Sequence, residues 1–201
     1  MDHDFDRQKA TYLKKLSSDA KDRSKKGDVD VQILPLLDAI NGHPDYYTTS
    51  SCAGRIDLFV EPASGKKHEG EWLFVSHDAV VFKDLEKIIT GRLPTNTTWF
   101  RMEGAILHVC CRDMDVAETF LRLCKETGWK HSGIMSSGSS TTGRIIIEST
   151  TSERMDVPVA KDDELFVPEK FVGFLVKEAN EKLLRTREKM NRLEKAVKSI
   201  S

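Results

Sequence analysis

The C-terminal end of the chain carries apolar side chains at alternating spacings of three and four residues. This spacing predicts one long helix over about 168–199, beginning at Pro168, with an apolar seam of about three and a half heptads. The seam consists of Val176, Ala179, Leu183, Thr186, Met190, Leu193, Val197 and Ile200. Such a seam packs either across the helix's own domain or against a second helix in a coiled coil, and we favour the first.

Upstream of this helix, strand-like segments alternate with amphipathic helices. We expect helices over about 4–17, from a cap at Asp30 to Asn41, from a cap at Asp78 over about 79–90, and from a cap at Asp115 to Gly128. The expected strands are 46–52, 55–61, 72–77, one on each side of Gly104, 132–135, 144–150 and 155–159. Pro158 restricts the last one to a sheet edge or a strand end. Residues 17–28 are polar and are expected to form a connector.

This order of elements predicts an α+β fold, with one mixed β-sheet packed with helices. Neither GxGxxG nor GxxxxGK follows an expected strand, so the fold is not expected to be a Rossmann or P-loop fold. A chain of 201 residues is expected to form a single domain over 1–201.

The composition excludes several classes of protein. The chain is 39% hydrophobic with charges of both signs, which is not typical of a disordered chain, and no apolar run is long enough to span a membrane. The first residues, MDHDFDRQK, resemble neither a signal peptide nor a transit peptide, and four cysteines are too few for a disulfide framework. We therefore expect a cytoplasmic protein with reduced thiols and no membrane partner.

The formal charge of −1 conceals an uneven distribution. Residues 1–27 carry eight Lys or Arg against five acidic residues, and residues 177–201 carry eight against four. Two basic ends are what a polyanion would require, although exposed helices also carry such residues for solubility.

The segment TTSSCAGR, residues 48–55, gathers the most polar side chains at one corner between two strands. Backbone amides and Arg55 could bind a carboxylate or phosphate there, although a polar hairpin turn has the same composition. Cys52 is a weak candidate nucleophile and more typical of a small core residue. His77 at a strand end is the better candidate base, whereas His108 between Leu107 and Val109 is more typical of a core histidine. The other cysteines lack zinc-ligand spacing, so no metal site is expected.

Several motifs together resemble the tRNA wybutosine-synthesising protein 3 family. They are SKKGDVD (24–30), TTSSCAGRI (48–56), WLFVSH (72–77), ILHVCCR (106–112), SGI (132–134) and AN-x-K (179–182), in the family's order over nearly the whole chain. The resemblance implies a methyltransferase with an α+β fold of its own. It implies transfer of a methyl group from S-adenosylmethionine to nitrogen-4 of 7-(3-amino-3-carboxypropyl)-4-demethylwyosine, the base immediately 3′ of the anticodon in tRNA(Phe). Other enzymes of the wybutosine pathway are possible partners.

The resemblance also implies the residues of the site. His77 is the expected general base, and Arg55 is expected to hold the carboxylate of the methyl donor or of the substrate base. The expected ligand-binding residues are Ser50, Ser51, Cys52, Gly54, Arg55, Ser76, Glu103, His108, Arg112, Ser132 and Asn180. At Glu148 the chain departs from relatives that carry arginine, so Arg144 or Arg154 is expected to supply that charge.

The basic ends are expected to bind the phosphates of tRNA. The candidates are Lys14, Lys15, Lys25, Lys26, Lys182, Arg185, Arg187 and Lys189. Two alternatives remain open: a non-catalytic RNA-binding module that stacks bases on Trp72, Trp99 and Phe100, and an interaction protein that dimerises through the C-terminal seam.

Overall fold

The structure is a computed structural model, which describes residues 2–17, 29–65, 69–137 and 143–200. Its contacts divide the chain into two compact units, each built around one β-sheet. Unit 1 comprises Met1–Ala53, Ala105–Ser152 and Arg187–Ser201, and unit 2 comprises Gly54–Gly104 and Glu153–Thr186. The expectation of a single domain stays a prediction.

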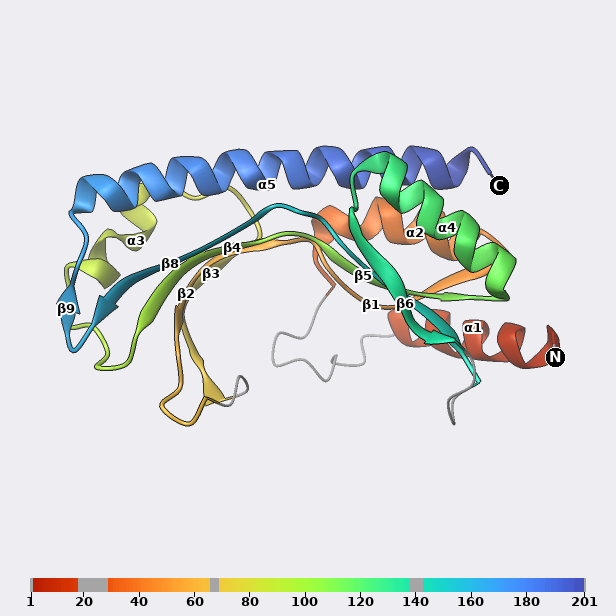
Figure 1. The fold of residues 1–201 in the computed structure, drawn as a ribbon, viewed down its shortest axis with the longest axis horizontal. Helices are drawn as coiled ribbons and strands as arrows, with labels where there is room; N and C mark the ends of the chain where they lie inside the picture. Colours follow the sequence, from red (N-terminus) through yellow and green to blue (C-terminus); the bar gives the residue numbers. More distant parts are fainter. Residues whose placement is uncertain (1, 18–28, 66–68, 138–142, 201) are drawn as a thin grey trace. The chain divides into compact units, whose positions relative to one another are not determined.

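Unit 1 contains a four-stranded sheet with the order β1-β5-β7-β6, in which every pair is antiparallel. The strands are β1 (Tyr46–Cys52), β5 (Ile106–Cys111), β6 (His131–Ser137) and β7 (Ile145–Thr150). Helices α2 (Leu34–Gly42) and α4 (Met114–Thr127) cover one face, and α1 (Asp2–Ser17) lies on the other (Figure 1). The alternation of side chains along each strand supports both layers: Leu107 and Val109 enter the main core, whereas Tyr47 and Cys110 pack against Phe5 of α1.

Unit 2 contains a five-stranded antiparallel sheet with the order β3-β2-β4-β8-β9. The strands are β2 (Arg55–Val60), β3 (Glu71–Ser76), β4 (Thr98–Glu103), β8 (Arg154–Lys161) and β9 (Glu164–Leu165). Ile56, Leu58, Phe100 and Met102 project from one face into the core that contains α3 (Phe82–Ile89) and the first part of α5. The alternate residues, Arg55 and Asp57 among them, therefore lie on the opposite face.

The long C-terminal helix α5 (Glu169–Lys198) is confirmed, and so is its packing against the chain itself. Val176, Ala179 and Leu183 are buried in the core of unit 2, and Met190, Leu193 and Val197 are buried in the core of unit 1. Because these side chains already have intramolecular partners, a coiled coil through this seam is not favoured.

The α+β class is confirmed, but two antiparallel sheets replace the one mixed sheet that we expected. Pro158 fits its position because β9 pairs only with Ala160 and Lys161, which leaves β8 without a second neighbour at the proline. The polar connector falls mostly on residues 18–28, outside the described part of the chain. None of the helices in the described residues is long and apolar enough to cross a membrane.

All three expected helix caps were wrong. Asp30 precedes a short 3₁₀ turn, Val31–Ile33, and makes no side-chain cap there. Helix α3 begins at Phe82, and its first-turn residue Asp84 accepts a hydrogen bond from the backbone N–H of Val81. Helix α4 is capped by Asp113, whose carboxylate accepts a hydrogen bond from Val116 N–H at 2.9 Å. At α4, Asp113 and Asp115 offer the same capping group, so composition alone did not identify the correct one.

Candidate functional site

In unit 2, His77 directly follows β3 and binds the corner segment at Gly54. Its Nδ1 lies 3.0 Å from the carbonyl oxygen of Gly54. A carbonyl oxygen only accepts hydrogen bonds, so Nδ1 carries the proton and the neutral ring has its lone pair on Nε2. Gly54 has φ +87°, in the left-handed region that favours glycine. The turn that presents this carbonyl therefore depends on the absence of a Cβ.

Arg55, the next residue, belongs to a buried network of charges on the same sheet. Its Nε lies 3.1 Å from Asp57 Oδ2, and a terminal nitrogen lies 2.5 Å from Glu103 Oε2. Asp57 is fully buried and also accepts a hydrogen bond from Arg101 Nε at 2.9 Å. Burial raises the pKa of the Asp57 carboxyl above its usual range, and the two guanidinium groups oppose this shift. Asp57 therefore fixes the positions of two arginines.

The segment that follows His77 is held by Asn180 of α5, within unit 2. Asn180 accepts a hydrogen bond from Val80 N–H at 3.0 Å and donates one to Val80 C=O at 2.8 Å. Ser76 forms two hydrogen bonds with the backbone of Asp78, at 2.9 and 3.1 Å. Ser76 and Asn180 thus hold the backbone that follows His77, and their described contacts are structural.

In unit 1, the end of β1 brings Ser50 next to His108. The register of β1 against β5 shifts between Thr48 and Ser50, and beyond this irregularity Ser50 pairs with His108. Ser50 Oγ is hydrogen bonded to His108 Nδ1, and His108 Nε2 lies 2.9 Å from Glu148 Oε2 on β7. The prediction that His108 lies in the core was wrong, because its side chain, on the sheet face opposite Leu107 and Val109, is 22% exposed. Ser51 pairs with Leu107 on β5.

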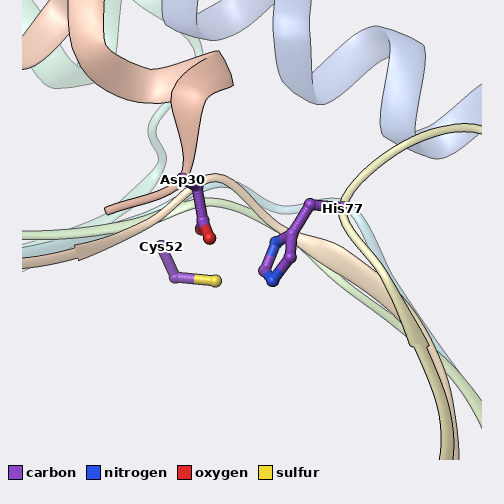
Figure 2. Close-up of side chains that lie close together, drawn as sticks. All are labelled: Asp30, Cys52 and His77. Atoms are coloured by element: carbon purple, nitrogen blue, oxygen red, sulfur yellow. The ribbon is translucent and has the colours of Figure 1, made fainter. Parts of the chain in front are cut away.

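Asp30 and Cys52 lie beside each other at the end of β1 in unit 1. The Asp30 carboxylate accepts a hydrogen bond from the backbone N–H of Ala53 at 2.7 Å, and one of its oxygens lies within 4.8 Å of Cys52 Sγ. Figure 2 shows both side chains, together with His77, which belongs to unit 2. The corner segment is therefore bonded at Ala53 in one unit and at the following residue, Gly54, in the other.

Two predicted ligand-binding residues have structural contacts elsewhere in unit 1. Ser132 Oγ donates to the Trp129 carbonyl at 2.6 Å and contacts the buried Ser149, which lies on the face opposite Glu148. Arg112 pairs with Asp45 and Asp6 at 2.6 and 2.7 Å, and these bonds connect α1 to the sheet.

Arg144 and Arg154, the two residues expected to supply the charge that is missing at Glu148, lie in different units. Arg144 donates to Tyr12 at 2.6 Å in unit 1, and Arg154 pairs with Asp156 in unit 2. Glu148 has His108 as its partner instead.

The predicted tRNA-binding residues of α5 have varied contacts. Arg185 donates to Glu153 at 3.2 Å, Arg187 donates to the Ala53 carbonyl, and Lys189 donates to Ser152 at 3.0 Å. Lys182 is half-buried, and Lys14 on α1 is exposed. The side chain of Lys15 and the whole of Lys25 and Lys26 lie outside the described residues.

Three cysteines have inert environments. Burial raises the pKa of the Cys124 thiol to about 11, and it raises the pKa of Cys110 and Cys111 as well. These thiols stay protonated near neutral pH and pack as small core residues.

Phe100 is also fully buried, so the predicted stacking of a base on Phe100 was wrong.

Sequence analysis did not assign to the site Asp30, Asp57 and Glu148, which lie next to predicted site residues, or Arg101, which binds Asp57. Asp57 alone had a local signal, because an acidic residue two positions from Arg55 on one strand lies on the same face.

A chain with this fold and these motifs matches a methyltransferase family over nearly its whole length. The sequence pattern of the family described as Methyltransferase TYW3 matches residues 7–199. The tRNA wybutosine-synthesizing protein 3 of Schizosaccharomyces pombe is 35% identical, with 96% of this chain and 86% of that protein covered. A tRNA(Phe) 7-((3-amino-3-carboxypropyl)-4-demethylwyosine(37)-N(4))-methyltransferase of Thermococcus sibiricus is 35% identical, with 98% and 95% covered.

Structural comparison agrees with these matches. The PH1069 protein from Pyrococcus horikoshii superposes with a TM-score of 0.88 at 32% identity, with 100% of this chain and 97% of that chain covered. The Arabidopsis thaliana tRNA wybutosine-synthesizing protein 2/3/4 is 36% identical over 90% of this chain, which spans only 19% of that longer protein. The chain belongs to the TYW3 methyltransferase family, as its motifs predicted. Neither the RNA-binding module nor the coiled-coil protein is favoured as an alternative.

Proposed function

We propose that this protein methylates nitrogen-4 of 7-(3-amino-3-carboxypropyl)-4-demethylwyosine at position 37 of tRNA(Phe). The observation that carries this proposal is the similarity, over 98% of the chain, to a relative named for that reaction. A methyltransferase requires a methyl donor, and we propose S-adenosylmethionine. Arg55 is the proposed partner of the donor's carboxylate, which would have to compete with Glu103 for the guanidinium, because an arginine supplies the positive charge and the N–H groups that an amino-acid carboxylate requires.

The chemistry assigns a task to His77. S-adenosylmethionine, when bound, supplies an electrophilic methyl group on a sulfonium. The ring nitrogen forms its new bond to carbon as the carbon–sulfur bond breaks, and the nitrogen must lose its proton. His77 is the base in this proposal, since the bond from Nδ1 to Gly54 leaves Nε2 as the atom that accepts this proton, directly or through water.

The remaining predicted residues support this arrangement in different ways. Gly54, Ser76 and Asn180 hold His77 and its segment in place, and Glu103 orients Arg55. Ser50, Ser51, Cys52 and His108 are proposed to contact ligands, and the contacts of Arg112 and Ser132 support positioning of the fold around them. We propose that both units act as one functional domain in the cytoplasm, alongside other enzymes of the pathway.

The activity is tested by analysing tRNA(Phe) nucleosides from cells that lack this gene. Mass spectrometry should find the 4-demethyl intermediate accumulating, and purified protein with S-adenosylmethionine should convert it to a product heavier by one methyl group. Normal modified nucleosides in the deleted strain, together with no conversion in vitro, would contradict the proposed reaction.

Replacing Arg55 with lysine is expected to lower the affinity of the protein for one of its two ligands and not for the other. Lysine keeps the positive charge beside Asp57 but loses the planar fork that binds a carboxylate at two points. We expect about tenfold or greater loss of affinity for either S-adenosylmethionine or the substrate tRNA, measured by calorimetry with each ligand. Unchanged affinity for both would remove this role from Arg55.

Binding of tRNA is expected to depend steeply on salt. Each phosphate contact made by a cation contributes about one unit to the log–log slope of affinity against salt concentration. Lys14→Ala and Lys182→Ala should each reduce that slope by about one unit, whereas Lys130→Ala, an exposed lysine outside the predicted set, should leave it unchanged. A slope near zero for the unaltered protein would argue against phosphate binding by the basic ends.

A further inference from the structure

Ser50, His108 and Glu148 form a continuous hydrogen-bonded row across three neighbouring strands of unit 1. Ser50 pairs in register with His108 across β1 and β5, and His108 pairs with Glu148 across β5 and β7. Side chains in register lie on the same face of a sheet, so the row is held by the backbone ladder itself. The His108 side chain is 22% exposed and that of Glu148 is 45% exposed, so the row lies at the surface of this sheet.

The chemical groups in this row give it a direction. The Glu148 carboxylate only accepts, so Nε2 of His108 donates to it across 2.9 Å. In the neutral ring, Nδ1 then has the lone pair and accepts the hydroxyl proton of Ser50. The only proton of Ser50 is therefore committed to His108. The lone pairs of Ser50 Oγ that are left can only accept a hydrogen bond.

We propose that Glu148 is a positioning residue that acts through His108 and makes Ser50 Oγ a hydrogen-bond acceptor for a ligand ammonium group. The carboxylate at the end of the row increases electron density along it, which favours a cationic donor. The inference rests on the proposed function, because S-adenosylmethionine and the substrate base both carry a 3-amino-3-carboxypropyl chain. Their shared chemistry is an ammonium beside a carboxylate, and the experiment below separates the two sources.

The first measurement is the tautomer of His108, which requires no activity. In ¹⁵N-labelled full-length protein, two-bond nitrogen–proton correlation spectra should show His108 with its proton on Nε2. Glu148→Arg places a group that only donates opposite Nε2, so the tautomer should move to Nδ1–H. Glu148→Gln keeps a carbonyl acceptor and should retain the Nε2 proton. A His108 that carries its proton on Nδ1 in the unaltered protein would overturn the proposal.

The second measurement is the affinity of the protein for each of the two ligands that carry the ammonium group, the methyl donor and the substrate base. Glu148→Arg and Ser50→Ala should each weaken binding of the same ligand about tenfold or more, and the double variant should be no weaker than the worse single variant. Calorimetry with S-adenosylhomocysteine tests the donor, and calorimetry with an anticodon stem-loop that carries the demethyl base tests the substrate. Glu118→Arg, an exposed glutamate on α4, controls for the change of charge.

The outcomes separate this inference from the proposed function. Additive losses, or a loss of affinity for neither ligand in variants that remain folded, would overturn the role of Glu148. If the unaltered protein binds neither probe, the proposed function fails as well, and the ligand assignment fails with it. Normal binding with the Nδ1–H tautomer would overturn the inference and leave the proposed function standing.

Discussion

His77→Gln is expected to reduce single-turnover methylation by about 10²- to 10⁴-fold, the usual contribution of a general base. Glutamine can still donate a hydrogen bond to the Gly54 carbonyl, so the local fold should be kept. Its amide cannot accept and retain a proton, so the ring nitrogen of the substrate would lose its acceptor. Rapid-quench assays with radiolabelled methyl donor would measure the step directly.

The affinity of His77→Gln for both ligands should remain within a few-fold of the unaltered protein. His131→Gln, an exposed histidine on β6, is the matched control and should retain full turnover. Methylation by His77→Gln at the unaltered rate would reject His77 as the base. A large loss of affinity together with turnover would indicate that His77 binds the substrate instead.

Asp57→Asn is expected to lower the free energy of unfolding by about 3–5 kcal/mol, as breaking a buried ion pair usually does. The substitution leaves Arg55 and Arg101 without their shared carboxylate, and both side chains are largely buried, at 16% and 11% exposure. Glu103 would still pair with Arg55, but the two guanidinium groups on neighbouring strands would share one carboxylate fewer. Urea unfolding followed by circular dichroism provides the measurement.

Asp156→Asn is the matched control for this prediction. Asp156 pairs with Arg154, whose side chain is 71% exposed, so we expect a change of about 0–1 kcal/mol. Equal stability losses for the two variants would show that the charges around Asp57 are better hydrated than their burial implies.

Periodicity in the sequence predicted most elements to within a few residues. The expected helices over about 4–17 and 168–199 are Asp2–Ser17 and Glu169–Lys198 in the structure. The β1 strand matched its predicted range, and Gly104 does separate two strands. This success has a local cause, since the spacing of apolar side chains along a helix or strand depends on backbone geometry alone.

The motifs were sufficient to predict the family, whose pattern matches residues 7–199. The motifs did not predict which residues contact one another in the folded protein. Asp30 was expected to cap a helix, but it binds the backbone of Ala53. His108 was expected in the core, but it joins Ser50 to Glu148.

The sequence by itself thus determined the class of fold, the family and the identity of the helices and strands. Tertiary structure alone decided that there are two sheets, that Glu148 lies opposite His108, and that Asp57 holds two arginines. The physical reason is that strand order and register join residues far apart along the chain. His108 and Glu148 are 40 positions apart, and a shift of one residue in pairing would place Glu148 on the opposite face of the sheet.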